Sequence, residues 1–492
     1  MLHQRGAGVL MHISSLPSPY GIGVFDRHAR DFIDRIADMG FTYWQVLPFN
    51  PIDGAGSPYC SPSAFAGNYL FIDPQGLQDM GLATAEEVAA NHYDGTPYTA
   101  DFAFAGERRL ALLEQAFLRI DDTLAAKIKA FEVENPWLTD YSVFMAVKEA
   151  ENGKPWWQWS DRHAHYHTCI QDIYAYESRA AFWKFVQYIF YLQWGNIKAY
   201  ANEKGVAVLG DMPIYVAMDS ADVWSGLPLF LIDEKTLKPE KVAGVPPDYF
   251  SENGQLWGNP LYDYEAMRKN GFEWWIRRIG GATKLYDVIR IDHFRGFESY
   301  WAVPCGKTTA RDGHWVKGPG ISLVGVLTGW FHDIEFIAED LGFPTPEVTQ
   351  LLVDSQLPGM KVLEFAFDSR DTSSYLPHSY GENCVCYTGT HDNAPLALWR
   401  TEADREDVAF AVQYLGLNER EGFNRGIIRG GMGSVAKLFV AQMQDWLDLG
   451  PGHRMNVPGT SCGNWKWRML PGEASHSLAG SIHEMTRIYG RL

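Results

Sequence analysis

Short apolar runs recur along the chain, and each is followed by polar or glycine-rich residues. They predict eight strands, at Gly8–Ser14, Tyr43–Pro48, Val206–Met212, Val288–His293, Glu335–Asp340, Lys361–Phe367, Cys384–Thr390 and Arg454–Pro458. Amphipathic patterns at helical spacing lie between most of these runs, for example at Arg27–Met39 and Ala180–Lys204. Strands that alternate with helices predict a parallel sheet, most simply a (β/α)8 TIM barrel of the α/β class.

The interval between the second and third predicted strands is far too long for one crossover. It carries helical patterns at Thr84–Asn91, which opens with the spacing of a capping box, at Gly106–Asn135 and at Tyr141–Glu151. No Ser-, Gly- or Pro-rich linker marks its edges. We therefore predict a single barrel over residues 1–492, with a large, mainly helical subdomain inserted at about 78–185.

The charge of the chain narrows the choice of partner. The formal net charge is −18 over 492 residues, and the acidic residues are scattered rather than clustered. This balance argues against a nucleic-acid backbone or an anionic membrane surface as a partner. We expect a neutral substrate.

The six cysteines do not form a disulfide framework. Cys384 and Cys386 are too close for the usual metal-binding pair, and two such neighbours in one strand do not bridge easily. We expect buried, reduced thiols. No secretory signal and no apolar stretch of membrane-spanning length is visible, so we expect a soluble, cytoplasmic protein with no membrane partner.

Aromatic residues are numerous, with 18 Trp, 24 Tyr and 27 Phe. Many will fill the core, but several lie among Gly, Pro and Asn, as in Pro247-Asp248-Tyr249-Phe250 and Gln255-Leu256-Trp257-Gly258-Asn259-Pro260. Aromatic side chains on loops are good platforms for flat apolar faces. Sugar rings have such faces.

The fourth predicted strand ends in charged residues, with Arg290 and Asp292 two positions apart. Side chains alternate along a strand, so the guanidinium and the carboxylate point the same way. A neighbouring cation keeps a carboxylate ionised, as an attacking group at neutral pH requires. Taken alone, the pattern is equally consistent with a structural ion pair at a strand end.

However, the third, fourth, fifth and seventh predicted strands each end in a carboxylate, at Asp211, Asp292, Glu339 and Asp392 respectively. In a barrel these ends meet at one mouth, where four acids would repel one another unless function kept them there. Paired carboxyls in different protonation states are what glycosidic bond chemistry needs.

The surroundings of each acid favour particular roles. Arg290 favours Asp292 as the nucleophile. The apolar residues before Glu339 favour a raised pKa of its carboxyl, which would let Glu339 act as the general acid. Asp340 alternates to the other face, so we interpret it as structural. Metal binding is the competing interpretation, but no His-Glu-x-x-His pattern or EF-hand-like loop is present, and a metal would not explain the aromatics.

Several long motifs in order resemble the 4-α-glucanotransferases, the amylomaltase or disproportionating-enzyme family of the α-amylase clan. The resemblance covers essentially the whole chain. It rests on His12-Ile13-Ser14-Ser15-Leu16-Pro17-Ser18-Pro19-Tyr20-Gly21-Ile22-Gly23, Trp44-Gln45-Val46-Leu47-Pro48, Ser57-Pro58-Tyr59, Ser63-Ala64-Phe65-Ala66-Gly67-Asn68 and Gly463-Asn464-Trp465-Lys466-Trp467-Arg468, together with the strand ends above.

The resemblance implies roles for individual residues. Asp292 would be the nucleophile, Glu339 the general acid/base, and Asp392 the third acid, which binds sugar hydroxyls and stabilises the transition state. The sugar at the cleavage point would be held by Asp211, Arg290 and His391, with Tyr59 stacking nearby. The segment Gly244–Asn259, within a second insertion at about 225–265, looks like the family's loop over the active site. The implied glucan contacts from this loop and elsewhere are Tyr249, Phe250, Trp257, Gly258, Asn259, Ser57 and Asn464.

The implied reaction is a retaining double displacement that moves a segment of a 1,4-α-D-glucan to the 4-hydroxyl of an acceptor glucose or glucan. Such a pair of carboxyls should lie roughly 5–5.5 Å apart. No cofactor and no metal is expected. Two alternatives stay open: a hydrolase or branching enzyme of the same clan, and a glucan-binding protein with an inactive site.

Overall fold

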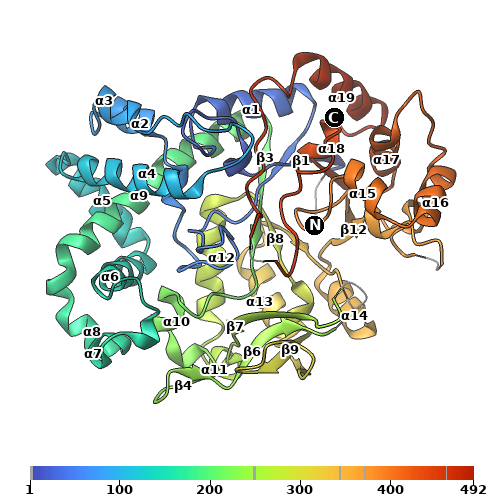
Figure 1. Ribbon diagram of the computed structural model, residues 1–492. Coiled ribbons are helices and arrows are strands. Elements are labelled where there is room, and N and C mark those ends of the chain that lie inside the picture. The colour runs from blue at the N-terminus through green and yellow to red at the C-terminus, as the bar shows by residue number, and fades with distance from the viewer. Residues whose placement is uncertain (1–3, 248–250, 343–344, 371–372, 461) are drawn as a thin grey trace.

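Eight parallel strands form the central sheet of the molecule (Figure 1). The computed structural model describes residues 4–247, 251–342, 345–370, 373–460 and 462–492. The strands are β1 (Gly6–Leu10), β2 (Tyr43–Gln45), β3 (Ala207–Met212), β8 (Val288–Ile291), β11 (Glu335–Ala338), β12 (Gly359–Val362), β13 (Cys384–Tyr387) and β14 (Leu438–Gln442). Their order in the sheet is β11-β8-β3-β2-β1-β14-β13-β12. The predicted (β/α)8 barrel is confirmed.

The sheet curves round so that its two end strands, β11 and β12, approach each other. The backbone N–H of Ala338 donates to the carbonyl of Pro358 at 2.9 Å. Beside it, Oδ1 of Asp340 accepts from the backbone N–H of Met360 at 2.7 Å. The Asp340 side chain thus ties the two end strands together, in agreement with its predicted structural role.

The eighth strand lies elsewhere than predicted. Residues Arg454–Pro458 are irregular, and the eighth strand is β14, which pairs with β1 on one side and with β13 on the other. A central strand of a barrel is buried on both faces and needs a continuous apolar run. Leu438–Gln442 supplies that run and is buried throughout, whereas Arg454 and Asn456 carry polar side chains.

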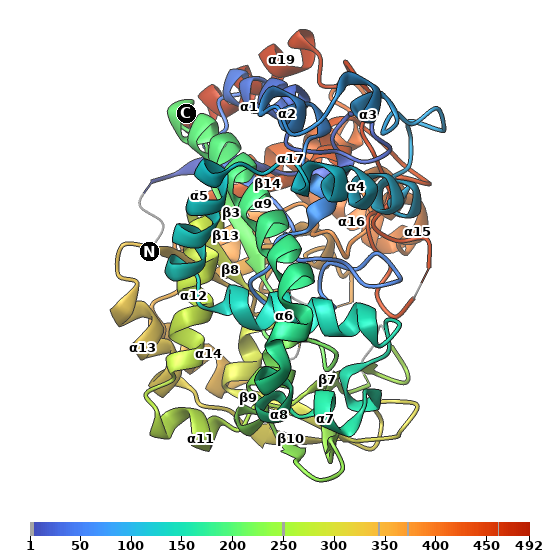
Figure 2. The same ribbon diagram turned by 90° about the vertical axis from the view of Figure 1, so that its left-hand side faces the viewer.

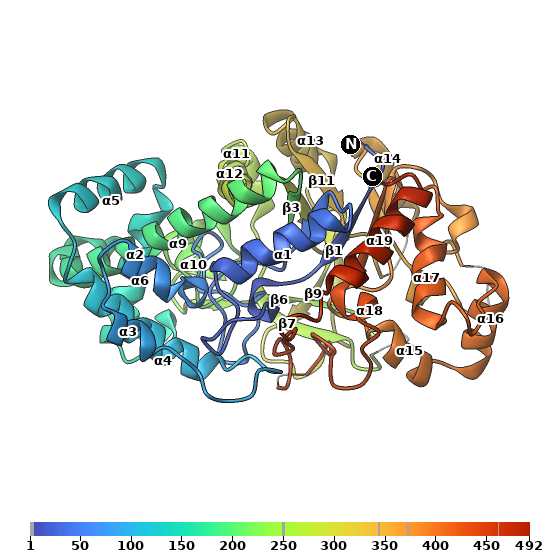
Figure 3. The ribbon, with the colours of Figure 1, turned by 90° about the horizontal axis from the view of Figure 1, so that it is seen from above.

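Helices cover the outside of the barrel. The predicted helices are confirmed as α1 (Arg27–Asp38), capped by the Asp26 carboxylate, and as the long α9 (Glu177–Glu203). Helix α19 (His476–Ile488) lies beside α1, so the two ends of the chain meet on one side of the barrel (Figure 3). The other helices outside the β2–β3 interval are α10 (Ala221–Ser225), α11 (Tyr264–Lys269), α12 (Glu273–Leu285), α13 (Ile321–Trp330), α14 (Pro346–Ser355), α15 (Leu396–Glu402), α16 (Arg405–Leu415), α17 (Phe423–Met432) and α18 (Met443–Trp446).

The interval between β2 and β3 is helical, as predicted. Besides α9, its helices are α2 (Pro74–Asp79), α3 (Ala85–Ala89), α4 (Phe102–Phe117), α5 (Asp122–Glu134), α6 (Trp137–Ala150), α7 (Asp161–Ala164) and α8 (Tyr166–Cys169). Of these, α4, α5 and α6 pack against α9 (Figure 2). The capping box of α3 is present: Thr84 Oγ1 accepts from the Glu87 N–H at 3.2 Å, and the Thr84 N–H donates to Glu87 Oε2 at 2.9 Å. The division of the chain at about 78–185 stays a prediction.

A second, antiparallel sheet lies to one side of the barrel and is drawn below it in Figure 1. It has the order β10-β9-β6-β7, with β6 (Lys241–Val245), β7 (Gln255–Pro260), β9 (Ser299–Pro304) and β10 (His314–Lys317). The segment expected to be a loop, Gly244–Asn259, therefore contains parts of two paired strands. A short pair, β4 (Ile232–Asp233) and β5 (Lys238–Pro239), precedes it.

All six cysteines are free thiols, and three of them, Cys169, Cys384 and Cys386, are buried. The expectation of buried thiols is therefore correct for these three and wrong for Cys60, Cys305 and Cys462, which are exposed; the expectation of a reduced state stays a prediction. Within the ranges of the chain that the structure describes, no helix is both long enough and apolar enough to cross a bilayer.

Candidate active site

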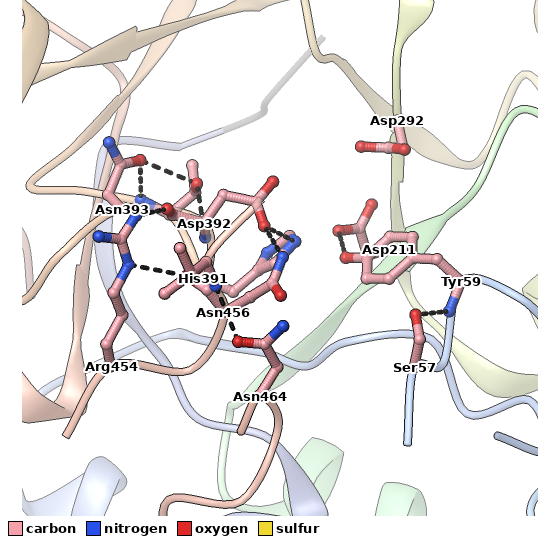
Figure 4. Close-up of polar contacts among 12 residues, drawn as sticks. Ser57, Tyr59, Asp211, Asp292, His391, Asp392, Asn393, Arg454, Asn456 and Asn464 are labelled. Carbon is pink, nitrogen blue, oxygen red and sulfur yellow. Dashed lines mark hydrogen bonds and ion pairs between the residues drawn. The ribbon is translucent and has the colours of Figure 1, made fainter. Parts of the chain in front are cut away.

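The four predicted acids come from the carboxyl ends of strands β3, β8, β11 and β13. Asp211 is the penultimate residue of β3, and Asp292 follows β8 directly. Glu339 follows β11, and its N–H donates to the carbonyl of Ile291 at 3.0 Å, which places it beside the end of β8. Asp392 lies in the turn after β13, across the site from Asp211 and Asp292 (Figure 4).

Arg290 binds two of these acids at once. Its Nη1 donates to Asp211 Oδ1 at 2.6 Å and Oδ2 at 2.7 Å, and to Asp292 Oδ1 at 3.1 Å. The predicted shared face of Arg290 and Asp292 is therefore confirmed. The closer partner, however, is Asp211, which lies opposite Arg290 in the pairing of β3 with β8. Side-chain exposure is 4% for Arg290, 0% for Asp211 and 28% for Asp292, so Asp292 is the member of the trio that solvent and ligands can reach.

Among the described residues, the hydrogen-bond donors to the Glu339 carboxyl are two backbone N–H groups. Its Oε2 accepts from the His293 N–H at 2.7 Å and its Oε1 from the Leu341 N–H at 2.8 Å. His293 has φ of 50°, in the left-handed region that a residue with a side chain rarely adopts, and this turn follows Asp292 directly. Burial raises the pKa of Glu339 to about 7, although Arg290 and the two N–H donors oppose the rise. Glu339 can therefore hold a proton near neutral pH.

The electrostatics of Asp292 and Glu339 are linked. Burial, together with the charges of Asp211, Glu339 and Asp392, raises the pKa of Asp292, while Arg290 opposes that rise. When the pair holds a single proton, the contact with the guanidinium favours the ionised form at Asp292. Among the residues that the structure describes, no cationic side chain lies within ion-pair distance of Glu339, so the proton is favoured on Glu339.

The turn after β13 presents His391 and Asp392. Asp392 Oδ1 accepts from Asn456 Nδ2 at 2.6 Å and lies 3.4 Å from His391 Nε2 (Figure 4). The backbone carbonyl of Asp392 accepts from Arg454 Nη2 at 2.6 Å. The side chain of Asp392 is 47% exposed, whereas that of His391 is 4% exposed. The carboxylate of Asp392 is thus held at one oxygen and open to the mouth of the barrel.

Tyr59 joins the two sides of the site. Its hydroxyl donates to Asp211 Oδ2 at 2.7 Å, and its ring stacks on that of His391 with centroids 5.2 Å apart. Trp465 packs beside both rings, at 5.7 Å from Tyr59 and 5.8 Å from His391. Ser57, in the same loop, accepts from the Tyr59 N–H through its Oγ at 3.3 Å. Tyr59 therefore lies against Asp211 and His391, with Ser57 two residues away in the same loop, and the predicted contacts of both with glucan stay predictions.

The second sheet reaches the site through Trp257 of β7. The Trp257 ring packs edge-to-face on the His293 ring with centroids 4.8 Å apart, and it is 37% exposed. Gly258 follows with φ of 78°, and Asn259 Nδ2 donates to the Val216 carbonyl at 2.8 Å. Asn259 thereby fixes the strand that carries Trp257. The other two predicted aromatic contacts, Tyr249 and Phe250, lie outside the described residues.

Asn464 is buried, and its side chain forms hydrogen bonds with residues shortly before it in the chain. Its Oδ1 accepts from the Val457 N–H at 3.0 Å, and its Nδ2 donates to the Thr460 carbonyl at 3.1 Å. In this arrangement the side chain stabilises the conformation of Val457 and Thr460 near Asp392. Its predicted contact with glucan stays a prediction.

Four residues of the site were not predicted from the sequence: Arg454, Asn456, Trp465 and Met360. Met360 Sδ accepts from Arg290 Nε at 3.3 Å. Trp465 lies inside a motif that the sequence does single out, and its φ of 67° turns the chain at that point. Arg454 and Asn456 carry no local signal, because their contact with Asp392 depends on how the barrel closes.

The arrangement supports chemistry that needs one ionised and one protonated carboxyl close together in a barrel mouth. Among the residues that the structure describes, no group of three or more His, Cys, Asp or Glu side chains is placed to hold a metal ion. The expectation that the reaction requires no metal remains an expectation.

Comparisons with known proteins agree with the motifs. The family model described as 4-alpha-glucanotransferase matches residues 11–473. The 4-alpha-glucanotransferase of Clostridium butyricum is 44% identical over 489 residues, which cover 98% of this chain and 100% of that protein. The 4-alpha-glucanotransferase of Thermus thermophilus is 42% identical over 503 residues, covering 99% of both chains.

Solved structures give the same result. Amylomaltase from Streptococcus agalactiae, determined in complex with acarbose, matches with a TM-score of 0.95 at 37% identity and covers 99% of this chain and 100% of that one. Amylomaltase from Corynebacterium glutamicum matches with a TM-score of 0.79 at 18% identity, over 99% of this chain and 75% of that one, which shows a shared fold. The resemblance inferred from the sequence motifs is confirmed.

Proposed function

This chain belongs to the 4-alpha-glucanotransferase family, and on that premise we propose that it moves a segment of a 1,4-alpha-D-glucan to the 4-hydroxyl of an acceptor glucose or glucan. The observation that carries the proposal is the pair of carboxyls at the ends of β8 and β11. Asp292 contacts the Arg290 guanidinium, whereas Glu339 contacts backbone N–H groups and has a pKa of about 7. One carboxyl is thus prepared to attack and the other to donate a proton.

In the first step, the Asp292 carboxylate attacks the anomeric carbon of the donor glucan. The bond from that carbon to the glycosidic oxygen breaks, and its electron pair stays on the oxygen. Glu339 gives its proton to the same oxygen, so the leaving glucan departs with a free 4-hydroxyl. The remaining segment is left as a β-linked ester on Asp292, and Glu339 is ionised.

In the second step, the 4-hydroxyl of an acceptor attacks the anomeric carbon of the ester. Glu339, now ionised, takes the hydroxyl proton, and the Asp292 carboxylate leaves. Two inversions restore the α configuration, and both carboxyls return to their starting protonation states. Water in place of the acceptor would give hydrolysis by the same steps.

Asp392 is suited to bind sugar hydroxyls, because its side chain is 47% exposed and one of its oxygens is already fixed by Asn456. We assign it to the third acid of the family, which stabilises charge at the sugar in the transition state. Tyr59 and His391 present stacked rings at the same mouth, supported by the buried Asp211. These groups would hold the sugar at the cleavage point.

The proposed transfer requires that an acceptor sugar outcompete water. Trp257 lies beside the residue that follows Asp292 and is partly exposed, as a platform for a sugar ring would be. Tyr249 and Phe250 belong to the same segment and are proposed to contact glucan with it, together with Gly258 and Asn259. Ser57 and Asn464 are proposed for more distant sugar positions. A positioned acceptor and a dry site both favour transfer.

Incubation with maltotriose tests the proposal. A transferase yields a ladder of longer maltooligosaccharides together with free glucose, because each transfer lengthens one chain and shortens another. A product mixture of glucose and maltose alone would indicate a hydrolase of the same clan. Glucan binding without any product would indicate an inactive binding protein.

A further inference from the structure

The carboxylate of the third acid has one close partner outside its own turn. Asn456 Nδ2 lies 2.6 Å from Asp392 Oδ1, closer than His391 Nε2 at 3.4 Å (Figure 4). Asn456 comes from the stretch between α18 and α19, 64 positions along the chain from Asp392. A contact of this length between an amide and a carboxylate is a charge-assisted hydrogen bond.

Asn456 is itself held in place. Its N–H donates to the His391 carbonyl at 3.1 Å, and its carbonyl accepts from Arg454 Nε at 2.7 Å. Arg454 Nη2 donates in turn to the backbone carbonyl of Asp392 at 2.6 Å. Arg454 and Asn456 together therefore hold the turn after β13, Arg454 through the backbone carbonyl of Asp392 and Asn456 through one oxygen of its carboxylate.

We propose that Asn456 is a positioning residue for the third acid, fixing the orientation of the Asp392 carboxylate toward the sugar, while Arg454 fixes the backbone beneath it. The inference rests on the proposed function, since it concerns the same site. It adds to that function a residue that does not touch the reacting atoms and acts through Asp392.

The charges around Asp392 explain why a neutral donor matters there. Asp292 lies across the mouth, and the charge of Asp392 is one of the causes that raise the pKa of Asp292. His391 approaches from the same turn. The Arg454 guanidinium contacts the Asp392 backbone carbonyl and lies 3.9 Å from Glu402 Oε2. The amide of Asn456 therefore supplies the closest stabilisation of the carboxylate itself.

The first test is Asn456→Ala, assayed by release of glucose from maltotriose. We expect kcat to fall about 10- to 100-fold, the range associated with losing one hydrogen bond to a charged group, with KM changed by less than about threefold. The change should fall on kcat because the carboxylate can still bind a hydroxyl but no longer holds one orientation. A loss confined to KM would contradict a positioning role.

The second test is Asn456→Asp, which should make activity depend on pH. A residue that merely stabilised the loop would not produce such a pH dependence. At low pH the new carboxyl is protonated, and its O–H can donate to Asp392 as the amide did. As pH rises, two carboxylates at hydrogen-bond distance repel, and Asp392 loses its donor. Activity relative to the unsubstituted enzyme should fall at least about tenfold between pH 5 and pH 8, whereas the Ala variant should keep the unsubstituted profile shape.

Asn202→Asp is the matched control. Asn202 Nδ2 donates to Asp287 Oδ2 at 2.9 Å, the same pair of groups, but Asp287 precedes β8 and so lies at the opposite end of the barrel. This variant should show the unsubstituted pH profile. The inference is overturned if Asn456→Asp also keeps that profile, or if Asn456→Ala retains full kcat. Absence of any transfer by the unsubstituted enzyme would instead overturn the proposed function, and this inference with it.

Discussion

The backbone N–H of His293 donates to the carboxyl of Glu339 at 2.7 Å, so the residue that follows Asp292 binds the second carboxyl of the pair. The left-handed conformation of His293 follows Asp292 directly, at the point where this N–H meets Glu339. The local turn of the chain, rather than side-chain packing alone, therefore couples the positions of Asp292 and Glu339.

Replacing Asp292 with Asn should abolish transfer. An amide is a poor nucleophile and cannot form the ester, so the rate of glucose release from maltotriose should fall on the order of 10⁴-fold or more. Binding of a non-reacting oligosaccharide should be largely retained, because Asn keeps the shape of Asp. Calorimetric titration with acarbose measures the second quantity, and unchanged transfer would remove Asp292 from the proposed role.

Replacing Arg290 with Lys should shift the pH profile. Arg290 opposes the rise in the pKa of Asp292, and a lysine amine cannot reach both Asp211 and Asp292 with the same geometry. The pKa of Asp292 should therefore rise further, and the acid limb of kcat/KM should move to higher pH. The profile is measured between pH 4 and pH 9. A limb that stays in place would show that Arg290 does not control the ionisation of Asp292.

Glu339 should destabilise the folded protein above neutral pH. Its pKa is about 7 in the fold and 4.5 in the unfolded chain, so the folded state binds more protons between these values and stability falls as pH rises through that window. The loss amounts to about 3 kcal/mol once pH exceeds 7. Glu339→Gln should thus be more stable than the unsubstituted protein at pH 8, with little difference at pH 4. Urea unfolding at the two pH values measures this, and equal differences at both would contradict it.

Arg491 should stabilise the closed barrel. It is fully buried near the end of the chain, where its guanidinium donates to the carbonyls of Gly6 at 2.8 Å and Ala436 at 3.0 Å, among others. Arg491→Ala leaves these carbonyls unpaired and should cost about 3 kcal/mol or more. Arg487→Ala removes an exposed pair with Glu484 and should cost less than about 1 kcal/mol. Equal unfolding midpoints for the two variants would show that the buried contacts contribute little.

The sequence predicts most of the barrel because most of its strands lie in short, largely apolar segments that are followed by polar residues. The eighth was misplaced at Arg454–Pro458, although Leu438–Gln442 is a more continuous apolar run. That run follows α17 closely and is followed at once by the buried α18, so periodicity does not isolate it as a strand. The second sheet was also missed, because its strands come from two separate insertions and pair only in three dimensions.

Some contacts of the candidate site could likewise be predicted from the sequence, and others could not. Arg290 and Asp292 could be predicted because two positions along one strand fix the direction of both side chains. The stronger contact of Arg290, with Asp211, depends on the register between β3 and β8, which no local window contains. The contact of Asn456 with Asp392 spans 64 positions and depends on the path of an irregular segment. Tertiary contacts of this kind have no sequence period to reveal them.

The central claim is that Asp292 forms the ester and Glu339 exchanges the proton. Glu339→Gln incubated with α-maltotriosyl fluoride tests it most directly, because fluoride leaves without an acid, whereas release of the ester requires the missing base. Mass spectrometry of the intact protein and of its peptides should show one maltotriosyl group, attached to Asp292. An unlabelled protein that still releases fluoride, or a label on any other residue, would contradict the account.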